Sequence, residues 1–183
     1  MDAFEEIVGV LLENDKYWVR HSVKINLTKK EKAQIGKPST PRPEIDIVAF
    51  DAMQNLIILI EVKSFLDSKG VIYEKVVENN EDPNGRYKLL TSKKYQDIIT
   101  KRLKSEWIAA GIINKKTKVS FGLIAGKISK MREVELNNYF SGKNWFFWGP
   151  TNLKEKLTAL SKKGYENCTI TIVTKLMQSK TCP

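Results

Sequence analysis

The sequence predicts an α/β domain in which a mixed central β-sheet is flanked by helices. Helical and strand patterns follow one another in the order helix, strands, helix, strands, helix, which is typical of α/β folds. Residues 56–64 (LIILIEVKS) are apolar on both faces of a strand, so this strand belongs in the middle of a sheet that is covered on both sides.

Length and composition set the frame for this fold. The chain has 183 residues, and no Gly/Ser-rich linker or repeat divides it, so we expect a single domain over residues 1–183. Apolar residues make up 42% and charged residues 28%, a globular balance without a run long enough to span a membrane. The acidic start predicts no secretion signal, and the two cysteines, Cys168 and Cys182, make no disulfide framework. These features favour a cytoplasmic protein.

The first third of the chain predicts a helix, a strand and a loop. Asp2 can cap a helix over residues 2–14, in which apolar residues recur at helical spacing. Residues 17–27 follow as a strand or strand-like segment with irregular apolar spacing. Residues 28–43 hold several lysines and three prolines, which predict a basic loop.

The middle of the chain predicts a hairpin followed by a long helix. A strand over residues 44–50 leads through the sequence DAMQN, a hairpin-like connection, into the buried strand. Residues 65–86 lack periodicity and predict a loop or a broken helix. Residues 87–110 then show a continuous helical pattern that Gly111 ends.

The last third predicts two strands and a helix. The strands cover residues 118–127 and 144–148, and a helix opens at Thr151 and runs to about Lys162. The next segment, CTITIVTKLMQ, is β-rich at its start but is also compatible with a helix. The aromatic run at 145–148 fits the core at strand spacing, and it is compatible with base stacking or a partner interface.

The charge of the chain points to an anionic partner. The formal net charge is +10, and much of the excess lies in three clusters. Basic faces attract the nucleic-acid backbone, although each single cluster is also compatible with a solvated helix face or loop. The clusters are Lys29, Lys30, Lys32, Lys37 and Arg42; Lys93, Lys94, Lys101, Arg102 and Lys104; and Lys115, Lys116 and Lys118.

Carboxylates meet where the two middle strands are expected to pair. Asp46 lies near the start of one strand and Glu61 near the end of the next, and paired strands are about 4.8 Å apart. Carboxylates at that separation repel one another unless a cation lies between them, and oxygen ligands suit Mg²⁺. Lys63 shares a strand face with Glu61, where it can orient water or stabilise charge on a phosphate. The simpler alternative is a surface ion pair between Glu61 and Lys63.

The stretches PEIDIVAFD and LIILIEVKS together resemble the PD-(D/E)XK nuclease superfamily. The resemblance implies a restriction endonuclease-like fold and Mg²⁺-dependent cleavage of double-stranded DNA. It implies that Asp46 and Glu61 bind the metal and that Lys63 is catalytic. Pro43 lies three residues before Asp46 rather than beside it, which departs from the motif of the superfamily.

The superfamily often adds residues from neighbouring helices to this site. A glutamate from the first helix implies Glu5 as a further catalytic residue, in the context Phe4-Glu5, with Glu6 as the rival. We prefer Glu5 because it flanks the apolar stripe of the helix, whereas Glu6 faces away from it. A polar residue from the helix after the buried strand implies Gln96.

Length, basicity and segment order are also similar to those of the small subunits of heterodimeric type IIS restriction endonucleases. That likeness implies a larger subunit that recognises the site and nicks one strand while the small subunit cuts the other. A homodimeric junction resolvase or repair nuclease, and a non-catalytic DNA-binding subunit, remain alternatives. His21 is the only histidine and no phosphate-binding GxxxxGK[ST] loop occurs, which excludes HNH nucleases and P-loop ATPases.

Overall fold

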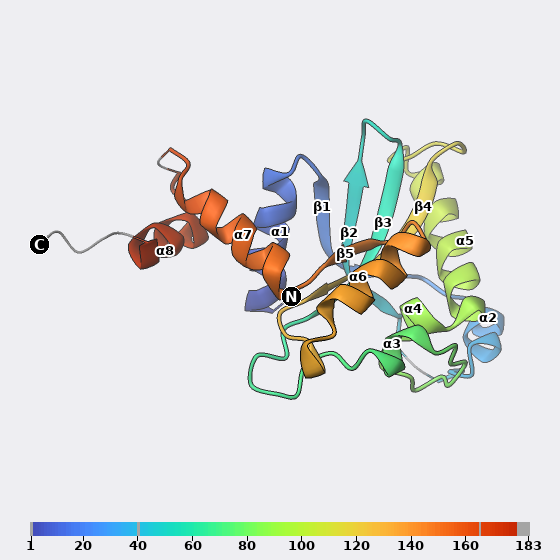
Figure 1. The fold of residues 1–183 in the computed structure, drawn as a ribbon. Helices are drawn as coiled ribbons and strands as arrows, with labels where there is room; N and C mark the ends of the chain where they lie inside the picture. The colour runs from blue at the N-terminus through green and yellow to red at the C-terminus, as the bar shows by residue number, and fades with distance from the viewer. Residues whose placement is uncertain (1, 40, 165, 179–183) are drawn as a thin grey trace, which may run out of the picture.

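A five-stranded mixed β-sheet forms the centre of the protein in the computed structural model, which describes residues 2–39, 41–164 and 166–178 (Figure 1). The strands lie side by side in chain order. The first three pair antiparallel, whereas the fourth pairs parallel to the third and the fifth parallel to the fourth. They are β1 (Trp18–Lys24), β2 (Glu44–Asp51), β3 (Leu56–Lys63), β4 (Lys118–Ala125) and β5 (Phe146–Trp148).

Helices cover both faces of this sheet. The apolar sides of α1 and α7 pack on one face, and those of α3, α4, α5 and α6 pack on the other. The expected α/β class with a mixed sheet is therefore confirmed. The helices are α1 (Ala3–Asn14), α2 (Lys29–Gln34), α3 (Glu74–Val77), α4 (Lys88–Thr91), α5 (Lys93–Ala109), α6 (Glu133–Gly142), α7 (Pro150–Ser161) and α8 (Thr169–Gln178), with a short 3₁₀ turn, η1 (Ser129–Met131).

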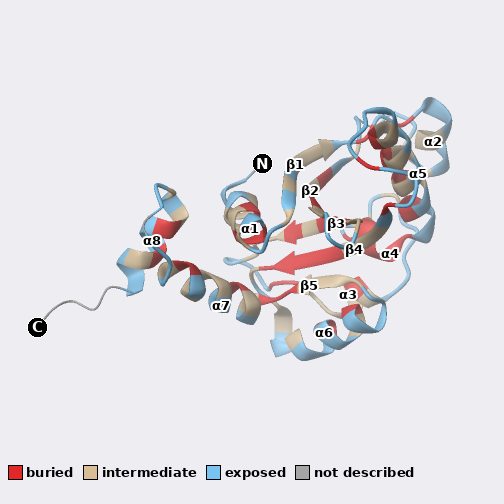
Figure 2. Ribbon diagram, turned by 90° about the horizontal axis from the view of Figure 1, so that it is seen from above, coloured by how far each residue is buried: buried red, intermediate tan, exposed pale blue. Residues whose placement is uncertain are grey.

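β3 is the central strand, and most of its residues are buried (Figure 2). Ile58 and Ile60 pack in the cluster that contains α1 and α7, whereas Ile57 and Leu59 pack in the cluster that contains α5. All four are at most 3% exposed, so the prediction of a strand covered on both faces is confirmed.

The structure contains two helices that we did not expect. Residues 28–43 hold α2, whose start is closed by a capping box between Thr28 and Glu31. The spacing Thr28-x-x-Glu31 is a signal for this helix, but the lysines and prolines around it led us to predict a loop. α6 buries Leu136 and Phe140, one helical turn apart, in a region where we expected no helix.

The long helix predicted over residues 87–110 is in fact two helices. α4 ends at Thr91, and Ser92 takes an extended conformation before α5 begins. The Ser92 hydroxyl then accepts a hydrogen bond from the Tyr95 amide and caps α5. Because of this break, α4 and α5 form separate walls around the end of β3.

The C-terminal part of the described chain is helical. α8 resolves the ambiguity of the segment CTITIVTKLMQ, and it packs against α7. Of the aromatic run only Trp148 is buried, among α1 and α7, whereas Phe147 is partly buried and packs on the opposite face beside α6. Cys168 is a free thiol, whereas Cys182 lies outside the described residues. None of the described helices is long and apolar enough to cross a membrane.

Candidate functional site

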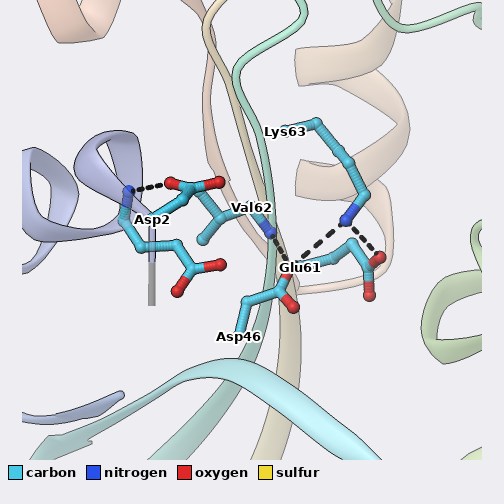
Figure 3. A network of polar contacts seen from close by, with 6 residues as sticks. Asp2, Asp46, Glu61, Val62 and Lys63 are labelled. Carbon is cyan, nitrogen blue, oxygen red and sulfur yellow. Dashed lines mark hydrogen bonds and ion pairs between the residues drawn. The ribbon is translucent and has the colours of Figure 1, made fainter. Parts of the chain in front are cut away.

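Asp46, Glu61 and Lys63 form one network of polar contacts at the end of β3 (Figure 3). The Lys63 ammonium lies 2.7 Å from Glu61 Oε1 and 3.2 Å from Asp46 Oδ2. Each of the three side chains keeps only about a fifth of its surface exposed. The structure thus brings the three residues together, as the strand spacing predicted.

The site lies where β2 and β3 separate. The two strands pair from Asp51 to Ile47 of β2, a register that would place Asp46 opposite Glu61. Pairing stops one step earlier, while β2 continues to pair with β1 as far as Glu44. The Val62 amide has therefore lost its backbone partner on β2, and Asp46 Oδ2 accepts its hydrogen bond at 2.8 Å. This bond locks the Asp46 carboxylate in the opening.

In β1 and β2 the regular alternation of side chains between the two faces of the sheet is interrupted next to Asp46. Ile47 packs on the side of α1, but Ile45, two residues earlier, packs on the side of α5. Ser22, the residue of β1 that faces Asp46 in the register, has a positive φ of 50°. Residues two apart on a regular strand share a face. The side chains of both strands therefore change faces of the sheet at this point. This change directs Asp46 into the opening, and Glu44 remains exposed at the strand end.

Burial controls the electrostatics of the site. Desolvation raises the pKa of Glu61, and the nearby Asp46 charge adds to this effect while Lys63 opposes it. For Lys63, desolvation alone would lower the pKa of the ammonium, but Glu61 and Asp46 outweigh it and the net shift is upward. Lys63 is therefore a charged bridge between Asp46 and Glu61, and burial makes the Glu61 carboxylate costly to ionise.

Glu5 and Glu6 of α1 point to different parts of the molecule. Burial and the Asp46 charge raise the pKa of Glu5, so its carboxyl group lies near the site. Glu5 Oε2 is buried and has no hydrogen-bond partner. Glu6 instead lines an apolar cavity with His21, and its charge acts on the pKa of that histidine. The geometry agrees with the preference for Glu5.

Gln96 bonds to the backbone of α4. Its side chain is buried in α5 and donates a hydrogen bond to the Leu89 carbonyl at 3.0 Å. This bond ties α5 to α4 across the break at Ser92, so Gln96 has a structural contact that the sequence did not reveal. The proposed role of Gln96 in the site gains no support from this position.

Lys88 and Tyr95 border the site, although the sequence did not single them out. The Glu61 charge acts on the pKa of both residues. Lys88 Nζ lies 5.1 Å from the centre of the Tyr95 ring. Their approach to Glu61 depends on the break between α4 and α5, for which Ser92, a helix-capping residue, is the local signal in the sequence.

The first two basic clusters lie on the same side of the protein. Arg102 of α5 contacts Glu31 of α2 at 2.6 Å, and Figure 1 shows α2 beside α5. Hydrogen bonds from Thr28 and Arg102 lower the pKa of Glu31 to about 2. The third cluster lies at the other end of the sheet, because Lys118 pairs with Leu56 at the start of β3 and Lys63 ends that strand.

His21 packs against α1 rather than joining the site. A side-chain carbon at Gly9 would lie 2.4 Å from the His21 ring, so glycine at this position makes room for the histidine. Burial lowers the pKa of His21. A structural role for this histidine agrees with the contact.

No family model, curated protein or solved structure matches the chain. Within the described residues, no group of three or more His, Cys, Asp or Glu side chains is arranged to hold a metal ion. The functional argument therefore depends on the geometry at the end of β3.

Proposed function

We propose that the protein is a Mg²⁺-dependent DNA endonuclease with a restriction endonuclease-like fold. The observation that carries the proposal is the contact of Lys63 with Asp46 and Glu61 at the point where two central strands separate. A surface ion pair would explain Glu61 and Lys63, but it would not explain a third, partly buried residue at a strand opening. The residue types and their strand positions support phosphodiester chemistry.

The side chains fit Mg²⁺ by their chemistry. Asp46 and Glu61 offer hard oxygen atoms, and Mg²⁺ is commonly bound by one or two carboxylates together with substrate phosphates. Glu5 Oε2, buried without a partner beside Asp46, is a further oxygen that a cation would satisfy. Asp46 and Glu61 would hold the ion, with Glu5 next to them.

The chain's own residues then have separate roles. When bound, Mg²⁺ would polarise the phosphate and make the ionisation of water easier. Asp46 is held in place by the Val62 amide, which keeps its second oxygen available. Lys63 directs its ammonium between the carboxylates, where it can donate to a phosphate oxygen or orient the attacking water.

A nicking assay tests this proposal. Supercoiled plasmid is incubated with the purified chain in Mg²⁺ and, in parallel, with an excess of chelator. We expect metal-dependent conversion to open-circular or linear DNA. A protein that binds the plasmid but leaves it intact in Mg²⁺, with and without candidate partner chains, would instead support the non-catalytic DNA-binding alternative.

Glu5 and Glu6 provide a matched pair of variants. Glu5→Gln is expected to weaken Mg²⁺ binding and cleavage about tenfold, the lower end of the range for residues that support a metal site. Glu6→Gln makes the same chemical change one residue away, on the side of His21, and should leave both properties unchanged. Metal titration followed by cleavage rates measures the two effects. Equal behaviour of the two variants contradicts a role for Glu5.

We further propose that the chain works with a larger recognition subunit on double-stranded DNA. The sheet and the helices that cover it account for most of the described residues, so little is left to form a separate base-reading module. Phosphate contacts from basic clusters position DNA but carry no sequence information. The partly buried aromatic residues 145–147 and the C-terminal helix α8, which exposes Leu176 and Met177, are our candidates for the subunit interface.

The partner proposal predicts little sequence-specific cleavage by the isolated chain. Long duplex DNA is digested in Mg²⁺ by the chain alone and together with a candidate large subunit, and the ends are mapped. Defined cleavage is expected only in the mixture. Discrete double-strand fragments at one sequence from the chain alone would favour the homodimeric alternative, because one active site cuts one strand.

A further inference from the structure

A cavity of about 430 Å³ opens on the side of the protein where α2 contacts α5. It lies between α2, the segment 81–83 and the start of α5, and Lys37, Lys88, Lys94 and Tyr95 form part of its wall. The charge of Glu61 also acts on the pKa of Lys88 and of Tyr95. Two wall residues of the cavity, Lys88 and Tyr95, therefore lie within electrostatic range of the site from which the proposed function was argued.

Lys88 is a cationic wall residue on whose pKa the charge of Glu61 acts. It is half-buried, with its Nζ 5.1 Å from the centre of the Tyr95 ring. Burial and the repulsion of Lys37 lower the pKa of Lys88, and Glu61 only partly offsets them. Ammonium groups that are held close together and partly out of water are stabilised by an anion that enters between them.

The two carboxylates in the cavity wall each accept a hydrogen bond from a neutral group. Glu81 accepts a hydrogen bond from the Ser92 hydroxyl, and Asp82 accepts one from the Asn84 amide. These bonds hold the segment 81–83 at the start of α5. Within the described part of the chain Lys88 forms no ion pair with either carboxylate, and its ammonium faces the Tyr95 ring.

The position of the cavity also fits a nucleic-acid strand. Lys37 follows α2 and Lys94 lies in the first turn of α5, so the first two basic clusters meet at this cavity. The contact between Glu31 and Arg102 holds the two helices together. Phosphates follow one another along a DNA strand at about 3.4 Å of rise, so a neighbour of the scissile phosphate comes within reach of groups that border the site.

We propose that this cavity receives a DNA phosphate adjacent to the scissile one and that Lys88 donates a hydrogen bond to it. The inference rests on the proposed nuclease function and adds a second phosphate contact to the one at the carboxylate site. Tyr95 supports the Lys88 side chain from below with its ring, and Lys37 and Lys94 add attraction from the two sides.

The test compares three substitutions by DNA binding. Lys88→Gln removes the charge, Lys88→Arg keeps it, and Lys162→Gln removes a charge at an exposed position at the end of α7. Binding of a short duplex is measured by fluorescence anisotropy in Ca²⁺ over a range of salt concentrations. Lys88→Gln should weaken binding about tenfold, as expected for one charge-assisted hydrogen bond, and lower the salt slope by ~0.9. Lys88→Arg and Lys162→Gln should both resemble the unmodified chain.

A second measurement separates contact from indirect effects. Single phosphates of the duplex are replaced by uncharged methylphosphonates, and the loss at one position should disappear in Lys88→Gln but not in Lys162→Gln. An unchanged salt slope in Lys88→Gln overturns the inference. So does a shifted pH–rate profile with unchanged binding, because Lys88 would then act only through Glu61. Failure of the nuclease proposal is recognised separately, as absence of cleavage by the unmodified chain while binding still reports on Lys88.

Discussion

Replacing Asp46 with Asn is expected to reduce Mg²⁺-dependent DNA cleavage by about 1,000-fold or more. The substitution removes one ligand charge from the proposed metal site, where several kcal/mol of electrostatic stabilisation are at stake and each 1.36 kcal/mol is a factor of ten in rate. Little volume changes, and the remaining carbonyl oxygen of Asn can still accept the hydrogen bond of the Val62 amide. The protein should therefore stay folded while activity is lost.

Glu61→Gln should have an effect of similar size for the same reason. Asp97→Asn is the control, since Asp97 also pairs with a lysine, Lys93, but on the exposed side of α5. Initial rates of plasmid nicking and circular dichroism spectra are compared for all three variants. Cleavage by Asp46→Asn at the rate of the unmodified chain would rule out the assignment of the site.

Replacing Lys63 with Met is expected to abolish cleavage and also to destabilise the metal-free protein. Asp46 and Glu61 would lose the cation that bridges them. Breaking a fully buried pair costs 3–5 kcal/mol, and we expect about 1–3 kcal/mol at pH 7 because these side chains keep part of their surface exposed. Urea unfolding in chelator measures this loss.

The pH dependence of this loss follows from the pKa of Glu61. Burial already raises that pKa above 4.5, and removal of the ammonium should raise it further. A carboxyl group whose pKa is higher in the folded state contributes stability below its unfolded pKa and loses that contribution as the pH rises through the folded pKa. The deficit of Lys63→Met should therefore shrink as the pH falls from 7 toward 4.5.

Metal and a matched substitution complete the test of Lys63. Mg²⁺ should restore stability to Lys63→Met more than to the unmodified chain, because the ion takes the place between the carboxylates, while cleavage remains absent. Lys93→Met removes an ammonium that contacts Asp97 at 2.8 Å on the exposed surface, and it should change stability little. A deficit that grows on acidification would contradict the proposed bridge.

The sequence alone was sufficient for features that depend on neighbouring residues. The strands β2 and β3 are joined by a short turn, so their pairing, and the register that brings Asp46 level with Glu61, follow from strand periodicity. The burial of β3 follows from its apolar residues on both faces. Asp2 caps α1 as expected, because a cap acts within one helical turn.

Other features depend on contacts between segments far apart in the chain. α2 has no buried residue, and its place is secured by the capping box and by Arg102, 71 positions away from Glu31. The approach of Lys88 and Tyr95 to Glu61 joins α4 and α5 to β3 across more than 25 positions, although the break at Ser92 between the two helices is capped locally.

The interruption of β1 and β2 at Ser22 and Asp46 is likewise a property of the assembled sheet. The periodicity of side chains along a strand describes one element at a time. It was enough to predict that Asp46 and Glu61 lie at the same level of neighbouring strands. Only the packing of α1, α4 and α5 around the end of β3 decided which other side chains surround them, because those contacts join segments that no local pattern relates.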